Sequence, residues 1–214
     1  MPGFFISLEG GEGAGKSTVI AALHAVLAEG GREVVATREP GGTPEGEAIR
    51  ELLLSPGQHL VPEAELLLMF AARAQLVRQV IRPALARGAA VLADRFTDAT
   101  FAYQGGGRGF DWQVLGELER MVQALPDGSL RQPDLTVWFD LDPLIAAERL
   151  ASARVPDKFE SQPADFFAAV RAGYARRESD MPNRFARIDA AQTMEAVGAD
   201  VSRIVRSWLQ GSAG

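Results

Sequence analysis

The chain has 214 residues, enough for one compact domain with a sizeable core, and 47% of them are hydrophobic while 23% are charged. It has no cysteine and two histidines, which excludes a disulfide scaffold, a thiol nucleophile and a cysteine-ligated metal site and argues against a histidine-rich metal centre. The net charge of −6 argues against a nucleic-acid partner such as duplex DNA, but it permits a local basic pocket for a small phosphorylated ligand.

The N-terminal residues have no basic segment ahead of their short apolar run. The longest uninterrupted apolar stretch, residues 66–72, is much shorter than the roughly 20 residues that cross a bilayer. We therefore expect a cytoplasmic protein with no membrane partner.

Short β-rich runs alternate with helical segments along the chain. The strands are expected at 4–8, 33–37, 89–93, 135–141 and 185–188. The helices are expected near 15–29, 44–54, 62–87, 111–124, 143–152, 163–179 and 193–209. This alternation predicts parallel strands joined by helical crossovers, with helices on both faces of the sheet. The sequence thus predicts a three-layer α/β fold in a single domain, 1–214, and loops at the glycine-rich segment 104–109 and the polar segment 152–163.

The segment after the first expected strand matches the phosphate-loop pattern of glycine, four residues and then Gly-Lys-Ser/Thr. Its residues are Gly10, Gly11, Glu12, Gly13, Ala14, Gly15, Lys16 and Ser17. Such a loop turns backbone N–H groups toward an anion at a helix N-terminus, where Lys16 adds a positive charge and Ser17 can ligate Mg²⁺. Lysine occurs only twice in the chain and arginine supplies the other 20 basic residues. A lysine at this position therefore predicts binding of a nucleoside triphosphate rather than a structural turn.

Further residues at the carboxyl ends of expected strands indicate an anionic acceptor. Arg38 follows the second strand and Arg95 follows the third, where ligands of open α/β sheets bind. Asp94 can complete a Mg²⁺ shell through water. Asp140 and Asp142 compete for this metal role, but Asp142 precedes a proline and is typical of a helix N-cap, so Asp94 is favoured.

Arg73 lies three residues after Phe70 in the long expected helix, so the two side chains share a face. An aromatic ring beside a bidentate hydrogen-bond donor could hold a base. Helix periodicity alone favours the alternative that Phe70 belongs to the core and Arg73 is solvated.

The motifs together resemble the bacterial type of the thymidylate kinase family of P-loop nucleoside monophosphate kinases. The phosphate loop, Thr-Arg-Glu-Pro-Gly-Gly at 37–42, Leu-Met-Phe-Ala-Ala-Arg at 68–73, Asp-Arg-Phe at 94–96 and Ala-Tyr-Gln-Gly-Gly-Gly-Arg-Gly at 102–109 occur in the order and spacing of that family. The resemblance implies a P-loop fold with a five-stranded parallel sheet flanked by helices and usually a homodimer. It also implies the reaction dTMP + ATP → dTDP + ADP with Mg²⁺.

The resemblance also implies contacts to the base of dTMP. Met69 or Phe70 would pack on thymine, and Arg73 and Gln104 would hydrogen-bond it. The same pocket would be lined by Thr100 and Tyr103.

The resemblance places the phosphate and sugar of dTMP next to this pocket. Arg95, together with Arg38 or Arg50, would hold the acceptor phosphate. Glu12 would face the 3′-hydroxyl of the sugar.

Members of the family whose phosphate loop has no basic residue ahead of the lysine carry arginines in a mobile lid, which is expected here at about 150–162. The candidates for the cation that neutralises the transferring phosphoryl group are Arg149, Arg154 and Lys158. The family's Asp-Arg-x-Glu is replaced by Asp-Lys-Phe-Glu at 157–160, so lysine stands where an arginine is usual.

Two other functions fit a phosphate loop, because the loop determines nucleotide binding and leaves the reaction to the rest of the site. One is a kinase for another nucleoside or nucleotide, and the other is a hydrolytic P-loop switch. The sequence has no interaction repeat or appended module that favours a switch.

Overall fold

The computed structural model describes residues 2–29, 31–55, 57–151 and 163–211. Five parallel strands form the central sheet in the order β2-β3-β1-β4-β5. Their bounds are Phe4–Gly10 (β1), Val34–Arg38 (β2), Ala90–Asp94 (β3), Leu135–Asp140 (β4) and Phe185–Asp189 (β5). The prediction of a five-stranded parallel sheet is confirmed, with each strand in an expected segment.

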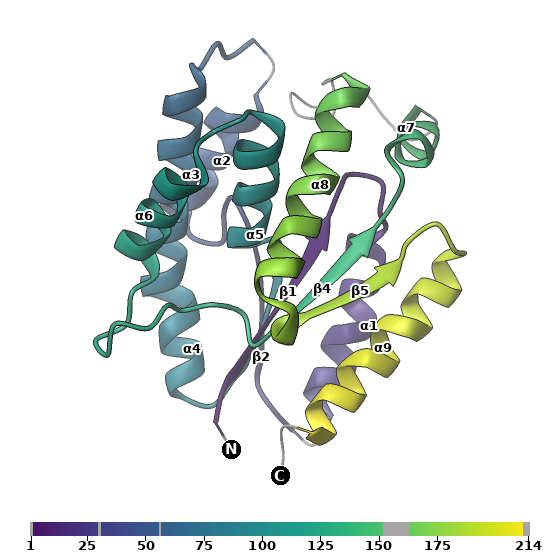
Figure 1. The fold of residues 1–214 in the computed structure, drawn as a ribbon. Helices are drawn as coiled ribbons and strands as arrows, with labels where there is room; N and C mark the ends of the chain where they lie inside the picture. Colours follow the sequence, from purple (N-terminus) through teal and green to yellow (C-terminus); the bar gives the residue numbers. More distant parts are fainter. Residues whose placement is uncertain (1, 30, 56, 152–162, 212–214) are drawn as a thin grey trace.

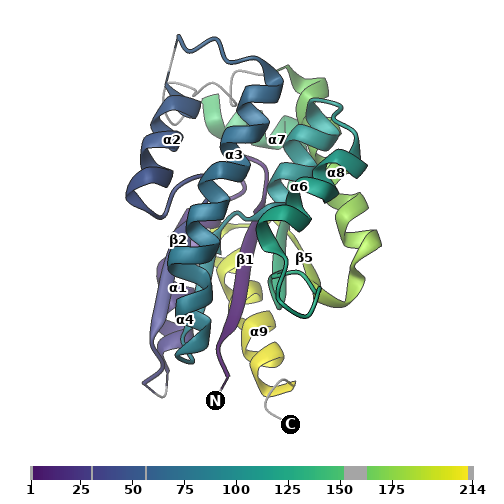
Figure 2. The ribbon, with the colours of Figure 1, turned by 90° about the vertical axis from the view of Figure 1, so that its left-hand side faces the viewer.

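Helices cover both faces of the sheet (Figure 1, Figure 2). The main ones are α1 (Lys16–Ala28), α2 (Pro44–Leu54), α3 (Pro62–Leu76), α4 (Arg82–Ala86), α6 (Trp112–Gln123), α7 (Pro143–Ala151), α8 (Ala164–Asp180) and α9 (Met194–Gly211). The remaining helical pieces are η1 (Val77–Ile81), α5 (Thr97–Thr100), η2 (Phe101–Gly107) and η3 (Pro182–Arg184). None of the helices in the described ranges is long and apolar enough to cross a membrane.

Alternating side chains of the strands divide the core into two layers, because successive residues of a strand point to opposite faces. Ile6 and Leu8 of β1 pack with the apolar residues of α1 and α9. Phe5 of the same strand packs with the helical run from α3 to α4, and Trp138 of β4 packs with α8. The predicted three-layer α/β fold is therefore confirmed.

Local sequence explains where the helices begin. Thr43 accepts a hydrogen bond from the N–H of Gly46 at the start of α2, where Pro44 occupies the first turn. Asp111 caps α6 in the same way by accepting from the N–H of Gln113. The long helical run expected over 62–87 is present, and η1 introduces a π-helical turn between α3 and α4.

The expected loop at 104–109 is wrong in its first part, because η2 extends the helix that begins at α5 through Gly107. The glycines here serve close packing between helices. A Cβ on Gly106 would lie 2.5 Å from the carbonyl oxygen of Ala169, and a Cβ on Gly173 would lie 2.8 Å from Cα of Ala102. A glycine-rich stretch thus marks a helix–helix contact rather than a flexible turn.

Candidate active site

A cavity of about 790 Å³ lies at the carboxyl ends of β1, β2 and β3. It brings together most of the predicted site residues from across the chain. They are Glu12, Gly13, Gly15, Lys16, Ser17, Arg38, Arg50, Met69, Arg73, Asp94, Arg95, Thr100, Tyr103, Gln104 and Arg149. Arg154 and Lys158 lie outside the described residues.

The phosphate loop connects the end of β1 to the start of α1. Gly13 and Gly15 have φ angles of 71° and 86°, a backbone region that glycine adopts without steric cost. The ammonium of Lys16 donates to the carbonyl oxygens of Gly10, at 3.1 Å, and Gly11, at 2.8 Å. Burial, followed by the nearby charge of Arg95, lowers the pKa of Lys16 to about 8. The loop therefore holds the Lys16 side chain in the wall of the cavity, where it can contact bound phosphates.

Arg95 follows β3 and has a φ of 70°, a conformation that non-glycine residues rarely adopt and that is enriched at functional sites. Its guanidinium donates to the carbonyl oxygen of Gly10 at 2.8 Å and to the hydroxyls of Tyr103 and Tyr174, both at 3.2 Å. It also forms an ion pair with the carboxylate of Glu12. Although burial opposes the charged form, Glu12 and the other anionic partners raise the pKa of Arg95, so a permanent cation borders the phosphate loop.

Arg73 of α3 is 2% exposed and reaches the cavity from the side of β2. Glu39 accepts hydrogen bonds from Nε, at 2.9 Å, and Nη2, at 2.6 Å, and Thr100 accepts a further one from Nη2 at 2.7 Å. The rings of Phe70 and Phe96 lie 4.9 Å and 5.4 Å from the guanidinium carbon. Among the described residues, no group accepts a hydrogen bond from Nη1, although this atom is buried. Nη1 is thus the donor that Arg73 can offer to a ligand.

The structure separates the two candidates for packing on a base. Met69 lines the cavity, whereas Phe70 is 2% exposed and belongs to an apolar cluster with Leu66, Phe101 and Leu115. Of the two expected candidates, Phe70 is therefore corrected to a core residue, because its ring packs in the apolar cluster and against the guanidinium of Arg73. The alternative from helix periodicity, that Phe70 belongs to the core, is confirmed, but its second part is wrong, because Arg73 is buried beside the cavity rather than solvated.

Gln104 of η2 lines the same part of the cavity and is 1% exposed. Its amide nitrogen Nε2 lies 3.4 Å from a carboxylate oxygen of Glu65, a residue of α3 that is also 1% exposed. Arg108 approaches the other oxygen of Glu65 at 3.5 Å. Sequence reasoning missed both Glu65 and Glu39. The signal that could have found them was their position, because Glu39 lies within the recognised motif at 37–42 and Glu65 lies within the helix expected at 62–87.

Arg38 and Arg50 both border the cavity, but their partners differ. Arg38 forms an exposed ion pair with Glu47 at 2.8 Å. Arg50 donates to the carbonyl oxygen of Pro40 at 2.8 Å rather than to a carboxylate. Burial and the adjacent charge of Arg38 lower the pKa of Arg50. The cationic charge of Arg50 is therefore less neutralised than that of Arg38.

Two of the residues around the cavity suit a divalent cation. The hydroxyl of Ser17 and the carboxylate of Asp94 both border it, and Oδ1 of Asp94 is buried with no hydrogen-bond partner among the described residues. Mg²⁺ binds through one or two protein oxygens together with water and substrate phosphates, so this donor set fits it. Asp140 instead pairs with Arg171 and Arg187 away from the cavity.

Asp142 has the capping role that its sequence suggested. Its carboxylate accepts a hydrogen bond from the N–H of Leu144 at 2.9 Å, in the first turn of α7. This contact accounts for the acid without any metal role.

Arg149 of α7 reaches the cavity from the opposite side. Its guanidinium donates to the carbonyl oxygens of Ala190, at 2.8 Å, Ala191, at 3.2 Å, and Gln192, at 3.3 Å. These bonds fasten the turn between β5 and α9 next to the phosphate loop. Of the three lid cations that the sequence proposed, Arg149 is the one within the described residues.

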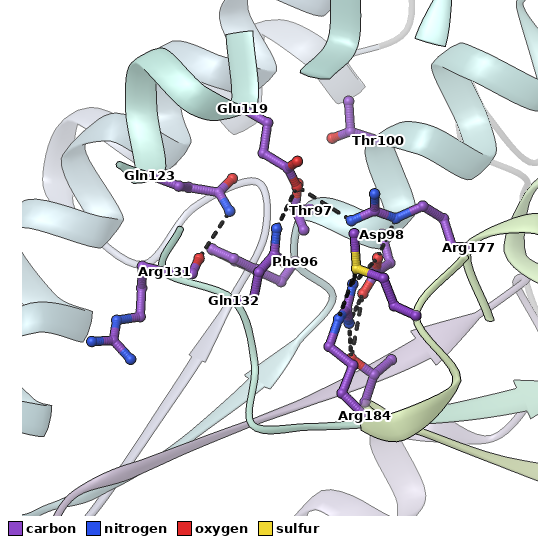
Figure 3. A network of polar contacts seen from close by, with 12 residues as sticks. Phe96, Thr97, Asp98, Thr100, Glu119, Gln123, Arg131, Gln132, Arg177 and Arg184 are labelled. Atoms are coloured by element: carbon purple, nitrogen blue, oxygen red, sulfur yellow. Dashed lines mark hydrogen bonds and ion pairs between the residues drawn. The ribbon is translucent and has the colours of Figure 1, made fainter. Parts of the chain in front are cut away.

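A buried charged network connects the segment that follows β3 to neighbouring helices (Figure 3). Asp98 of α5 accepts hydrogen bonds from Arg177 and Arg184, both at 2.7 Å. Glu119 of α6 accepts from Thr97 at 2.8 Å and from Arg177 at 3.3 Å. Burial alone would raise the pKa of Asp98, but the two arginines lower it to about 2. The network ties α5 to α6 and α8 and so fixes the residues around Thr100 in the cavity wall.

Comparison with known proteins identifies the family. A family model described as thymidylate kinase matches residues 8–201. The chain belongs to the thymidylate kinase family. The thymidylate kinase of Albidiferax ferrireducens is 57% identical, covering 97% of this chain and 98% of the relative, and a Pseudomonas putida thymidylate kinase is 53% identical over 98% of both.

A solved structure supports the same membership. The crystal structure of thymidylate kinase from Ehrlichia chaffeensis superposes with a TM-score of 0.77 at 30% identity, covering 96% of this chain and 99% of that one. The resemblance that the motifs predicted is confirmed, and the chain is a kinase of the nucleoside monophosphate class.

Proposed function

We propose that this chain transfers the γ-phosphoryl group of ATP to the phosphate of dTMP, giving dTDP and ADP. The observation that carries this proposal is one cavity that joins a complete phosphate loop to the buried donors and acceptors of Arg73 and Gln104. A site for hydrolysis alone would have no use for the second set of residues.

On the ATP side, the backbone N–H groups of the phosphate loop and Lys16 bind the phosphates. Ser17 and Asp94 hold Mg²⁺, which supplies charge neutralisation of the phosphate oxygens when it is bound. The burial of Lys16 strengthens its attraction to the phosphates, because the interior screens charge less than water does.

On the acceptor side, Arg95 and Arg50 hold the phosphate of dTMP. Arg95 is permanently charged and lies next to the phosphate loop. Within the described part of the chain no carboxylate is hydrogen-bonded to Arg50, whereas Arg38 is paired with Glu47. Glu12 shares Arg95 with the acceptor phosphate and faces the sugar.

The base binds between Met69 on one side and the polar groups of Arg73 and Gln104 on its edge. Thr100 and Tyr103 complete this part of the wall. Thr100 acts chiefly through Arg73, to which its hydroxyl is bonded.

In the transfer step, an oxygen of the dTMP phosphate attacks the γ-phosphorus in line, and the bond from that phosphorus to the bridging oxygen of ADP breaks. No proton has to move, so the residues act by alignment and by neutralising charge. Arg95 and Arg149 contribute from the described residues. The segment 150–162 would act as a lid of the single domain and add Arg154 or Lys158.

We also infer a cytoplasmic homodimer with no nucleic-acid partner. Exposed apolar side chains of α3 and α6 support the dimer, since these two helices pack against each other and present Leu67, Val114 and Met121 outward. The net charge of −6 does not favour a polyanion.

A coupled assay of ADP formation tests the proposed reaction. Wild-type protein with Mg²⁺-ATP is expected to form ADP rapidly with dTMP and slowly without an acceptor. Parallel assays with dUMP, dCMP, AMP and thymidine test whether another nucleotide or nucleoside is the preferred acceptor. Lys16→Ala should abolish transfer. Arg87→Ala should retain it, because Arg87 is an exposed cation paired with Glu33 at the amino end of β2, outside the cavity. Equal ADP formation with and without an acceptor would instead establish a hydrolytic switch.

A further inference from the structure

A glutamine side chain can present either of two opposite groups to a ligand, the donor Nε2 or the acceptor Oε1. Gln104 borders the cavity from η2 and is 1% exposed, so the orientation of its amide determines which group a base would meet. A neighbouring residue that fixes this orientation would therefore influence which base is accepted.

Glu65 is placed to fix the amide. Its carboxylate lies 3.4 Å from Nε2 of Gln104, and Arg108 approaches its other oxygen at 3.5 Å. A charged carboxylate can only accept hydrogen bonds, so it must face the amide NH₂ rather than the amide oxygen. With Nε2 directed to Glu65, the oxygen Oε1 is the atom that Gln104 can offer to a base.

Arg73 supplies the complementary group on the same wall of the cavity. Glu39 and Thr100 occupy its Nε and Nη2, and among the described residues its buried Nη1 has no acceptor. The wall thus presents one donor and one acceptor. A base with a carbonyl oxygen next to a ring N–H, such as O4 and N3–H of thymine or uracil, matches this pair, whereas cytosine presents an amino donor and a ring acceptor at these positions.

We propose that Glu65 is a positioning residue for base selectivity, which makes the site reject cytosine by holding the Gln104 amide in a single orientation. Glu65 does not line the cavity and acts only through Gln104. The proposal rests on the proposed function, because it concerns how that site distinguishes dTMP from other nucleoside monophosphates.

The substitution Glu65→Gln tests this role because it replaces a pure acceptor with a group that can also donate to Oε1 of Gln104. The amide can then turn and present Nε2 to the base. We expect the ratio of kcat/KM for dTMP to kcat/KM for dCMP to fall about tenfold or more. The ratio for dTMP over dUMP should stay unchanged, because both bases carry O4 and N3–H. The KM for ATP should also stay unchanged.

Two control variants separate this effect from other consequences. Glu63→Gln makes the same change at an exposed position of α3 and should leave both ratios unchanged. Arg108→Leu removes the ion pair to Glu65 and the cation–π contact with Phe166 but leaves the Glu65 carboxylate facing Gln104, so it should preserve most of the preference for dTMP over dCMP. In a Gln104→Leu background, Glu65→Gln should cause no further loss of selectivity, since its effect runs through the amide.

Several results would overturn the proposal. These are an unchanged dTMP/dCMP ratio in folded Glu65→Gln, an equal loss in Arg108→Leu, or parallel losses for dTMP, dUMP and dCMP that indicate a loosened site. If Glu65→Gln does not fold, Glu65→Leu replaces it, because it also removes the acceptor and should narrow the same ratio. Absence of dTMP phosphorylation by the wild type would refute the proposed function instead, so the two failures are distinguishable.

Discussion

Two arginine–glutamate pairs in this chain have the same bidentate geometry but opposite burial. Glu39 binds Nε and Nη2 of Arg73 in the interior, and Glu33 binds Nε and Nη2 of Arg87 at the surface, where both side chains are about half exposed. Removing one partner of a buried pair leaves a charge without compensation, whereas water solvates an exposed one. The buried pair therefore couples the stability of the molecule to the geometry of the proposed base site.

Glu39→Gln is expected to lower the free energy of unfolding by about 3 to 5 kcal/mol, because Arg73 stays charged and buried. Glu33→Gln, the matched exposed control, should change it little. Urea denaturation of the two variants measures the difference. Similar losses in both variants would show that burial of the Arg73 pair is not what matters.

Glu9 of β1 is a further buried acid that sequence reasoning missed, besides Glu39 and Glu65. Phe96 donates its backbone N–H to one carboxyl oxygen at 2.7 Å, and the hydroxyl of Tyr174 donates to the other at 3.1 Å. Burial first, and then the charge of Asp98, raises the pKa of Glu9 from its usual 4.5 to about 8. Glu9 is thus protonated in the folded protein at neutral pH and ionised in the unfolded chain.

This difference predicts how stability depends on pH. Folding takes up a proton between pH 4.5 and pH 8, so the contribution of Glu9 to the free energy of unfolding is complete below pH 4.5 and falls as the pH rises to about 8. Glu9→Gln is neutral at every pH and lacks this loss. The stability of Glu9→Gln relative to wild type should rise across this window by up to about 1.4 kcal/mol per pH unit and level off above it. Urea denaturation at a series of pH values checks this, and a constant difference would contradict it.

Among the elements, η2 and α8 carry several residues of the proposed acceptor site, so their packing against each other bears on its geometry. η2 carries Tyr103 and Gln104, and α8 carries Tyr174, which bonds to both Arg95 and Glu9. Glycines on both helices allow the close approach, and the Asp98 network in Figure 3 holds the preceding helix α5 to α8. Displacing η2 should therefore disturb the site for dTMP more than the site for ATP.

Gly106→Ala tests this contact, because the new Cβ would lie 2.5 Å from the carbonyl oxygen of Ala169. We expect a loss of about 1 to 3 kcal/mol in the free energy of unfolding from overpacking, and a larger rise in KM for dTMP than for ATP. Gly116→Ala in α6 is the matched control. Apart from the backbone of its own helix, none of the described residues places an atom within 4 Å of this added Cβ, so the substitution should stabilise the helix by up to about 1 kcal/mol. Thermal unfolding and steady-state kinetics distinguish the two, and equal behaviour would refute the packing argument.

At the scale of the whole molecule, the order of the strands assembles the site. β1 is central, with β3 on one side and β4 on the other, so the phosphate loop after β1 lies beside the Asp94-Arg95 segment after β3. Arg38 at the end of β2 comes next in the sheet. Parallel pairing brings these three carboxyl ends to one edge, which is where such sheets bind ligands.

The outer face of α3 and α6 gives a prediction about assembly. Leu67 and Met121 are 57% and 72% exposed on these neighbouring helices. If this face joins two copies, Leu67→Glu combined with Met121→Glu should convert the dimer to a monomer, because burying charges in an apolar interface is costly. Leu144→Glu, at a similarly exposed leucine of α7, should leave the dimer intact. Sedimentation velocity measures all three forms, and a monomeric wild type would refute the proposed dimer.

Local features of this chain were predictable from the sequence alone. The strands could be located because each is a short, mostly apolar run, and the three central strands β1, β3 and β4 are buried on both faces. The phosphate loop could be located because its glycines, lysine and serine act within one short segment. The cap at Asp142 also depends only on neighbours in sequence. In each case the physical cause lies within a few residues of the feature.

The partners within the site were decided by the tertiary structure. Glu39 and Arg73 stand 34 positions apart, and Glu65 and Gln104 stand 39 apart, so their contacts depend on how α3 packs against the ends of β2 and η2. Helix periodicity could not tell which of the adjacent residues Met69 and Phe70 would face the cavity, because both lie near the boundary between core and site. Likewise, Gly-Gly-Gly at 105–107 is typical of a loop in isolation, whereas in the folded chain it is helical and packs closely against α6 and α8.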